Sequence, residues 1–573
     1  MKFVELATYL EKLEKTSSRI EITKILAELF RKTDAFEIDK TVYLLLGSLA
    51  PNYEGVVFNV AEKMIIKAIA LTYGYDGKAV NGLYKKAGDL GIVTETLAKK
   101  SHFTAHNSPL SITDVYQKLM DVARDSGEES VERKIQKISE LFKNLDPRST
   151  RFVARIPLGR LRLGFSDKTV IDALSWMEAG DKSLRSQLLK AYEVVPDIGF
   201  LAKRVKEVGA AIASKNIKPV VGIPVLPALA QRLNSPVEMI EKMGKVAVEP
   251  KFDGLRVLIH FSRSKKMLKA FTRNLNDVSE MFPELTNIGD YIKGYEVILD
   301  TEATGMDPEM IKIMNFQTTM KRRRIHDVNE TAGQIPLRFQ VFDILFKDGQ
   351  SLMGTAYLQR RKVLSGTVKE NDLMVVDEAV ITEDPKVIER QYQKNIDKGL
   401  EGVVVKKVDS PYIPGRTGYR WVKMKDAEGS KAKLMDTIDC VVMGYMSGKG
   451  KRTQFGLGKI LVGIMQGEKV RTLTKVGTGF TERILGEMKK RLDKISLNKK
   501  PDNYIVDKNL EPDVWTYPKL VVEIAADEIT KSPNHSLGIS LRFPKFIRFR
   551  DDKNPDQATT LKELKKLFEI QRV

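Results

Sequence analysis

The sequence predicts a multidomain protein with an all-α N-terminal domain, a central α+β domain and a small C-terminal β-barrel. Its 573 residues are too many for one hydrophobic core. Hydrophobic residues make up 42% of the chain and charged residues 30%, as in packed globular domains. Because the hydrophobic periodicity changes twice along the chain, we expect domains at residues 1–217, 218–427 and 428–573.

The first domain is expected to consist of helices. Apolar residues recur every three or four positions in segments such as Ser111–Val122 and Val131–Leu145. The loops predicted around Arg148–Arg151 and Gly159–Arg162 are rich in arginine and precede helix starts, where backbone N–H groups and arginines suit phosphate contacts. Solvated helix ends would give the same pattern, so both interpretations stay open.

The central domain begins at a helix-breaking segment, KPVVGIPVLP, at Lys218–Pro227. Beyond it, β-branched and alternating residues dominate, which indicates an α+β domain. The expected strands are Val246–Phe261 with a break at Gly254, Tyr295–Glu302, Phe339–Phe346 and Gly402–Lys406, and the expected helices are Asp307–Met320 and Pro385–Lys398.

The third domain begins near Asp436 and contains short apolar segments separated by glycine-rich or charged turns. About five such strands in this length fit a small barrel of the OB type, which commonly binds nucleic acids. A helix at Thr559–Ile570 is expected to close the chain.

The charge balance favours a polyanionic partner. The chain carries 95 Lys and Arg against 75 Asp and Glu, a formal charge of +20, so nucleic acid is the leading candidate and a generally basic surface the alternative. No apolar run of about 18 residues or signal peptide is visible, which argues against a membrane protein. The single cysteine, Cys440, cannot form an intrachain disulfide, so a cytoplasmic location is expected.

One segment, Glu249–Arg256 (EPKFDGLR), concentrates reactive side chains. The strand period of two places Glu249, Lys251 and Asp253 on one face before Gly254 turns the chain. A nucleophilic lysine needs desolvation or nearby positive charge to lose its proton, and Arg256 offers such charge. Taken alone, the segment also fits an ordinary hairpin with surface charges.

Further motifs follow in a fixed order. They are Phe271–Arg273, Leu299–Glu302, Val341–Asp343, Glu401–Lys406, Trp421–Lys425, Leu541–Pro544 and Arg550–Lys553. With Lys251–Arg256, this series resembles the nucleotidyltransferase superfamily of DNA ligases, RNA ligases and capping enzymes. The helical, adenylation and OB domains in this order are similar to ATP-dependent DNA ligases of the archaeal and eukaryotic replicative type. An RNA ligase or capping enzyme stays the alternative enzyme, and a non-catalytic DNA-binding protein the alternative class.

The resemblance implies an enzyme that seals 5′-phosphate/3′-hydroxyl nicks in duplex DNA through an AMP-lysine intermediate, in replication, repair and recombination. It implies ATP and Mg²⁺ as cofactors, with Mn²⁺ as an alternative to Mg²⁺, and nicked double-stranded DNA as partner. A monomer with no membrane attachment is expected, with a sliding clamp as a further partner whose weak candidate contact is Lys99–Phe103.

The resemblance also assigns residues. Lys251 would be the catalytic nucleophile, and Glu302 and Glu401 the metal ligands. The nucleotide would be bound by Glu249 beside the adenine amino group, Phe342 on the adenine ring, and Arg256, Arg273, Glu302, Arg416, Lys423 and Lys425 on ribose and phosphates. The lysines of Trp421–Lys425 alternate and so share a strand face toward the α-phosphate, where their charge would also lower the pKa of Lys251.

Two features of the resemblance are particular to this chain. Thr417 stands where the family usually carries an arginine, so a shifted position is expected to supply the guanidinium, either the adjacent Arg416 or Arg420 in the same segment. The C-terminal basic residues Arg542, Arg550 and Lys553 would orient the pyrophosphate of ATP, with a hinge expected at Asp426–Lys431 because that segment is small and polar.

Overall fold

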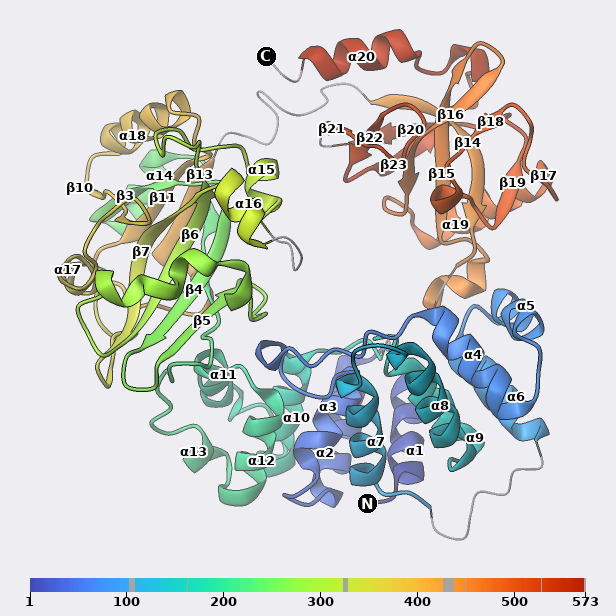
Figure 1. The fold of residues 1–573 in the computed structure, drawn as a ribbon, viewed down its shortest axis with the longest axis horizontal. Coiled ribbons are helices and arrows are strands. Elements are labelled where there is room, and N and C mark those ends of the chain that lie inside the picture. The colour runs from blue at the N-terminus through green and yellow to red at the C-terminus, as the bar shows by residue number, and fades with distance from the viewer. Residues whose placement is uncertain are drawn as a thin grey trace. The chain divides into compact units, whose positions relative to one another are not determined.

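The computed structural model describes residues 1–101, 109–161, 163–322, 328–425, 437–448, 450–526 and 528–570. Two compact units form: Met1–Tyr73 with Thr94–Lys425, and Gly74–Val93 with Asp426–Val573. Helices come first along the chain, then mixed structure, then a sheet-rich region (Figure 1). This order confirms the predicted fold class. The expected hinge at 426–431 lies outside the described residues.

The N-terminal region is helical as predicted, and side chains cap several of its helices. Ser111 Oγ accepts a hydrogen bond from the backbone N of Asp114 at 3.1 Å, and Asp146 caps a helix whose first residue is Pro147. The helices are α1 (Phe3–Glu14), α2 (Arg19–Lys32), α3 (Ile38–Leu46), α4 (Glu62–Tyr73), α5 (Gly77–Ala87), α6 (Leu90–Lys100), α7 (Ile112–Arg124), α8 (Ser130–Lys143), α9 (Pro147–Arg155), α10 (Asp167–Ala179), α11 (Arg185–Val194), α12 (Ile198–Val208) and α13 (Ala210–Ala213).

The arginines expected in a basic loop lie within α9 and face carboxylates of other helices. Arg148 Nε lies 3.3 Å from a carboxylate oxygen of Glu11. Arg151 contacts Glu14 and has a nitrogen 3.4 Å from Glu95. These ion pairs connect α9 to α1 and α6, so a DNA phosphate would compete with carboxylates already in place. The predicted phosphate contact of these arginines stays a prediction, and Arg162 lies outside the described residues.

The central region contains two large sheets, ordered β5-β4-β6-β7-β8, with β9 paired to β7, and β10-β3-β11-β13-β2, and a two-stranded sheet of β1 and β12. Gly254 separates β3 from β4 as predicted. A larger residue does not fit at this position, because its side chain would collide with the carbonyl oxygen of Ala303. The strands are β1 (Ala228–Leu229), β2 (Gln231–Arg232), β3 (Val246–Lys251), β4 (Leu255–Ser262), β5 (Met267–Thr272), β6 (Glu296–Gly305), β7 (Leu337–Lys347), β8 (Gln350–Ser351), β9 (Met374–Val376), β10 (Val380–Thr382), β11 (Gly402–Lys407), β12 (Gly415–Arg416) and β13 (Trp421–Lys425).

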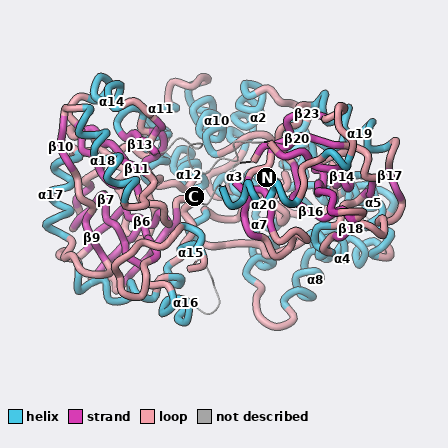
Figure 2. The backbone as a smooth tube through the Cα atoms, turned by 90° about the horizontal axis from the view of Figure 1, so that it is seen from above, coloured by secondary structure: helices cyan, strands magenta, loops and turns pink. Residues whose placement is uncertain are grey.

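Helices pack against these sheets: α14 (Pro236–Met243), α15 (Phe316–Met320), α16 (Val328–Gln334), α17 (Tyr357–Thr367) and α18 (Pro385–Asp397). Figure 2 shows α14 and α18 beside β11 and β13, and the apolar side chains of Met239, Met243 and Ile388 bury Val403 and Val405 of the smaller sheet. The packing leaves the opposite face of this sheet to the site described below.

The expected helix at Asp307–Met320 is wrong over most of its length, since only α15 is helical. A carboxylate oxygen of Asp307 accepts hydrogen bonds from the backbone N of Ile311 and Lys312, at 2.7 and 3.0 Å. This side chain therefore stabilises a turn that competes with a helix start.

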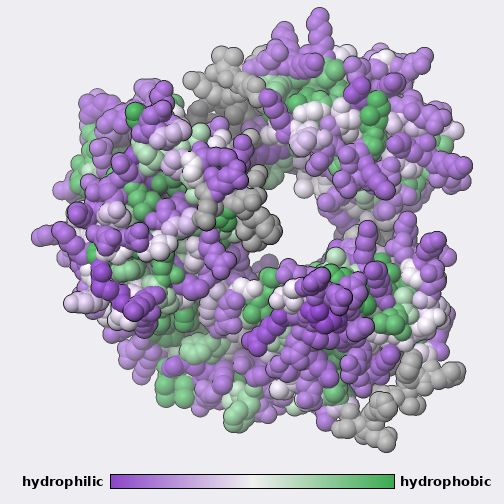
Figure 3. Space-filling view, in the orientation of Figure 1, coloured by the Kyte–Doolittle hydropathy of each residue, from purple (hydrophilic) through white to green (hydrophobic). Residues whose placement is uncertain are grey.

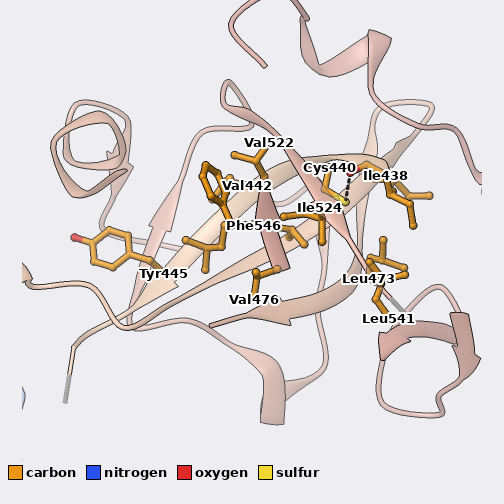
Figure 4. Close-up of a cluster of buried hydrophobic side chains, with 14 of the residues drawn as sticks. Ile438, Cys440, Val442, Tyr445, Leu473, Val476, Val522, Ile524, Leu541 and Phe546 are labelled. Carbon is orange, nitrogen blue, oxygen red and sulfur yellow. Dashed lines mark hydrogen bonds between the residues drawn. The ribbon is translucent and has the colours of Figure 1, made fainter. Parts of the chain in front are cut away.

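The C-terminal region is built around a sheet ordered β17-β19-β14-β15-β16-β18, and β20 pairs with both β14 and β23. Its buried core includes Cys440, Val442 and Phe546 (Figure 4). The strands are β14 (Ile438–Met446), β15 (Lys459–Gln466), β16 (Lys469–Val476), β17 (Ser496–Leu497), β18 (Tyr504–Ile505), β19 (Val514–Thr516), β20 (Val521–Ala525), β21 (Glu528–Lys531), β22 (Ile539–Arg542) and β23 (Lys545–Phe549), with helices α19 (Glu482–Asp493) and α20 (Leu561–Ile570). The closing helix was predicted.

Polar residues cover much of the visible face of each region, and apolar residues appear there in small groups (Figure 3). Among the described residues, no helix is both long enough and apolar enough to cross a lipid bilayer.

Candidate active site

A cavity of about 560 Å³ opens in the central region between the two sheets. Its wall includes most of the residues singled out from the sequence: Glu249, Lys251, Arg256, Arg273, Glu302, Phe342 and Lys423. Glu401, Lys425 and Arg416 are not part of the wall. Its size is in the range of cavities that hold small organic ligands.

Lys251 ends β3 and lies next to two further charged residues. The strand register pairs Lys251 with Gly402 of β11, and Gly402 with Lys425 of β13. Glu401 precedes β11, donates its backbone N–H to the carbonyl oxygen of Lys251 at 3.0 Å, and accepts a hydrogen bond from Lys251 Nζ. Its other carboxylate oxygen lies 3.0 Å from Lys425 Nζ. One carboxylate thus bridges two ammonium groups.

The charges in this cluster shift pKa values in opposite directions. Burial raises the pKa of Glu401, but Lys251 and Lys425 outweigh burial, so that the pKa is lowered overall. The pKa of Lys423 is lowered by burial and then by the positive charges of Lys251 and Lys425. Positive charge is therefore concentrated beside Lys251 at this end of the cavity.

Glu302 lies on β6 and lines the same cavity. Burial raises its pKa to about 7, although the positive charges of Lys251 and Arg256 lower it. A carboxyl group of this kind is partly protonated at neutral pH, and a bound cation would favour its ionised form. Together with Glu401, it offers hard oxygen ligands of the kind that Mg²⁺ prefers. No cluster of three or more His, Cys, Asp or Glu side chains suited to a metal occurs in the described part of the chain.

Arg256 lies on β4, and groups of other strands hold its guanidinium. Its Nε donates to Asp300 at 2.9 Å, another nitrogen donates to the other Asp300 oxygen at 2.5 Å, and Nη1 donates to the carbonyl oxygen of Ala228 at 2.5 Å. The guanidinium also lies over the Phe342 ring, 5.3 Å from its centroid. Arg256 therefore fixes this ring, whereas Arg273 is exposed at the cavity wall.

Phe342 and Glu249 also line the cavity and contact residues to which the sequence analysis assigned no individual role. Phe342 packs edge-on against Trp421, with ring centroids 6.3 Å apart. The Glu249 side chain is buried and pairs with Lys406 Nζ at 2.6 Å, and it accepts a hydrogen bond from the Tyr357 hydroxyl. Lys406 ends the quoted Glu401–Lys406 motif, so its position was visible in the sequence. Tyr357 carries no such signal.

The structure does not bring Arg416 into the cavity. Arg416 is exposed on β12, where it pairs with Leu229 of β1. The neighbouring Thr417 is buried, and its hydroxyl donates to the carbonyl oxygens of Leu229 and Trp421, each at 3.2 Å. Thr417 therefore links two backbone segments at the position where the family usually carries an arginine. A role for the Arg416 guanidinium stays a prediction.

The basic residues of the last motif lie in the C-terminal region, where acidic partners hold them. Arg550 Nη1 donates to both oxygens of Asp439, at 2.9 and 2.7 Å, and Lys553 Nζ lies 2.6 Å from the same carboxylate. Arg542 is exposed and lies 2.6 Å from Glu528. Their predicted action on pyrophosphate would require these carboxylates to give way.

Three models of protein families match most of the chain. Residues 2–175 match a family model described as DNA ligase N terminus, residues 227–425 one described as ATP dependent DNA ligase domain, and residues 453–553 one described as ATP dependent DNA ligase C terminal region.

Relatives of full length carry the same likeness. A probable DNA ligase of Dictyoglomus turgidum is 40% identical over 583 residues, covering 100% of this chain and 98% of that protein. A DNA ligase of Sulfurisphaera tokodaii is 36% identical over 594 residues, with the same coverage of 100% and 98%. The solved structure Pmar-Lig_PreS3 has a TM-score of 0.54 and 18% identity over 95% of this chain and 99% of its own, a likeness of fold alone.

Proposed function

Because this chain belongs to the family of ATP-dependent DNA ligases, we propose that it seals nicks in duplex DNA by carrying AMP on Lys251. Lys251 Nζ attacks the α-phosphorus of ATP, a P–N bond forms, and the P–O bond to pyrophosphate breaks. The 5′-phosphate of the nick then takes AMP from Lys251. Finally, the 3′-hydroxyl oxygen attacks that 5′-phosphorus and releases AMP.

The observation that carries this proposal is the convergence of Lys251, Lys423, Glu302 and Phe342 on one cavity. An aromatic ring suits the flat face of a base. Cationic groups suit the phosphates, because they stabilise the negative charge that develops at the α-phosphate during transfer. These groups come from β3, β13, β6 and β7, so the fold and not chain proximity assembles them.

The residues around Lys251 also support its reactivity. A lysine acts as a nucleophile only without its extra proton, and neighbouring positive charge favours that form. Lys423 lines the cavity together with Lys251, so its ammonium group is placed to provide such charge. Glu401 contacts Lys251 Nζ and so holds it in place before ATP binds. Lys425, bound to the other oxygen of Glu401, adds charge outside the cavity wall.

We propose Mg²⁺, with Mn²⁺ as substitute, as the metal that Glu302 and Glu401 hold. The donor set fits, since both groups are carboxylates and the half-buried Glu302 has a raised pKa that a cation would restore toward its ordinary value. When bound, the metal neutralises charge on the phosphate oxygens. Arg273 is proposed to contact the phosphates from the exposed wall, and Glu249 and Phe342 to lie at the adenine.

Nicked double-stranded DNA is the proposed partner, and the net charge of +20 supports it. We keep residues 1–217, 218–427 and 428–573 as the proposed domains, and a cytoplasmic monomer as the proposed state. A sliding-clamp contact at Lys99–Phe103 is also proposed, although residues 102–108 lie outside the described part of the chain.

The test is covalent labelling by ATP tagged at the α-phosphate. We expect label on wild type and none on Lys251→Ala, while the variant still seals nicks that already carry a 5′-adenylate, since Lys251 is needed only to load AMP. A matched control is Lys407→Ala, a β11 lysine that does not line the cavity. Label on Lys251→Ala would show that another residue carries AMP, and label from GTP in place of ATP would favour a capping enzyme.

A further inference from the structure

Asp377 lies directly after β9 and lines the cavity, but the proposed function gives it no role. Its side chain is 3% exposed, and its Oδ1 atom has no hydrogen-bond partner among the described residues. Its backbone N donates to the carbonyl oxygen of Val341 at 3.0 Å, which places Asp377 beside Phe342. A buried polar atom without a partner is costly, so such an atom in a binding cavity indicates a missing ligand group.

The neighbouring cations are engaged elsewhere. Lys406 Nζ donates to Phe342 O at 3.1 Å and lies 2.6 Å from Glu249. Arg361 lies 3.5 Å from Glu249 and donates to the backbone oxygen of Asp377. Burial and the negative charge of Glu249 raise the pKa of Asp377 well above its ordinary value, against the effect of Lys406 and Arg361. A neutral carboxyl keeps a carbonyl oxygen that accepts a hydrogen bond.

We propose that Asp377 reads the base of the bound nucleotide by accepting a hydrogen bond from the exocyclic amino group of adenine. This rests on the proposed function, because the base must lie in the cavity against Phe342. Val404 of β11, Phe342 of β7 and Asp377 all line the cavity, and the hydrogen bond from Asp377 N to Val341 O places Asp377 next to Phe342, where the base would lie. Asp377 then selects purines that carry an amino group at position 6, and its unpartnered oxygen is satisfied only when such a base is bound.

The test compares ATP with the triphosphate of unsubstituted purine riboside, which lacks the amino group. The rate at which the nucleotide becomes covalently attached is measured at low nucleotide concentration, from the increase in mass of the intact protein. Wild type should prefer ATP by roughly tenfold or more, since the analogue leaves a buried acceptor unpaired. Asp377→Leu should bring the two rates to within about twofold of each other. Asp377→Asn should keep the wild-type preference, because its carboxamide retains the carbonyl oxygen and the shape of a neutral carboxyl.

The outcomes separate the two proposals. The role of Asp377 would be overturned if Asp377→Leu kept the wild-type ratio of the loading rates with ATP and with the analogue. It would also be overturned if this ratio were near one in Asp377→Asn. If Asp377→Leu is too unstable to load either nucleotide, the Asp377→Asn ratio alone decides. The matched control is Asn274→Ala, a change at another polar residue of the cavity wall, which should affect both nucleotides alike. A wild type that loads neither nucleotide would instead refute the proposed function.

Discussion

Two groups of basic residues, one at the cavity of the central region and one in the last motif, are neutralised in different ways. At the cavity, Lys251 and Lys425 share the single carboxylate of Glu401. In the C-terminal region, Asp439 accepts from both Arg550 and Lys553, and Asp552 adds a second carboxylate to Arg550. Two ammonium groups beside the cavity thus share one carboxylate, and Lys423 in the cavity wall adds a third cation that an anion could meet. The C-terminal group, by contrast, must exchange carboxylate for phosphate before it acts.

The largest effect is expected at the cavity. Lys423→Ala should slow loading of AMP by roughly 100-fold or more, because a fixed cation aimed at the developing charge is lost. Lys423→Arg should recover part of the rate, and Lys407→Ala on the neighbouring strand should leave it unchanged. The rate of labelling by ATP, with labelled ATP in excess, measures this. A Lys423→Ala rate within a few-fold of wild type would mean that the cavity's charge is not directed at ATP.

A smaller effect is expected from the C-terminal group. Arg550→Ala should slow AMP loading by about 100-fold at most and leave the sealing of pre-adenylated nicks within roughly tenfold, because no pyrophosphate remains to be oriented. Asp439→Asn is the variant to compare with Arg550→Ala, since it disturbs the same ion pairs but keeps both Arg550 and Lys553. It should load AMP at a rate within a few-fold of wild type. Equal losses in both variants and both assays would show that the cluster only holds the fold.

The pH dependence of stability tests the state of Glu302. Its folded pKa of about 7 lies above the value of an unfolded glutamic acid, so ionisation destabilises the folded protein as pH rises from about 4.5 through 7. Glu302→Gln should therefore gain stability relative to wild type between pH 5 and pH 8, by at most about 1.4 kcal/mol per pH unit. Thermal unfolding without metal measures the difference. The exposed Glu309→Gln is the control, and a Glu302→Gln difference that does not change with pH would contradict a raised pKa for the Glu302 carboxyl.

The smallest effect is expected from α9. Arg151 is engaged with Glu14 and Glu95, so Arg151→Ala should change the slope of log K for nicked duplex against log salt by less than about 0.9, the value for one phosphate contact. Glu14→Gln should raise the slope's magnitude if Arg151 is freed toward DNA. A loss of about 0.9 in Arg151→Ala would show that the ion pairs open when DNA binds, and would make this helix part of the DNA interface.

Much of the fold was predictable because periodicity reports directly on burial. The break at Gly254 and the strands on either side of it follow from alternation, and the helical N-terminal region follows from its three-and-four spacing. The helix prediction for residues 307–315 failed because the Asp307 carboxylate accepts hydrogen bonds from the backbone N–H groups of Ile311 and Lys312, a local competition that apolar spacing does not report. The loop predicted around Arg151 is instead part of α9, which Asp146 caps and Pro147 begins, and the ion pairs of Arg151 with Glu14 and Glu95 could not be predicted because these partners are distant in sequence.

The candidate site was predictable where a motif supplied the residues. Lys251, Glu302, Phe342 and Lys423 lie on separate strands, and the cavity brings them together. Asp377 and Tyr357 could not be found in this way, because their role depends on which buried side chain lacks a partner or receives a hydrogen bond. Such pairing is a property of the packed structure and leaves no spacing in the sequence.

Trp421 gives this cavity an optical consequence. It is one of three tryptophans in the chain, its indole is 3% exposed and lines the cavity, and Lys406 Nζ lies 4.2 Å from its ring centroid. Occupation of the cavity changes the polarity and the charge that this indole experiences. Its ultraviolet emission therefore reports nucleotide binding without any attached dye, and replacing Trp176 and Trp515 with phenylalanine would leave a single emitter at the site.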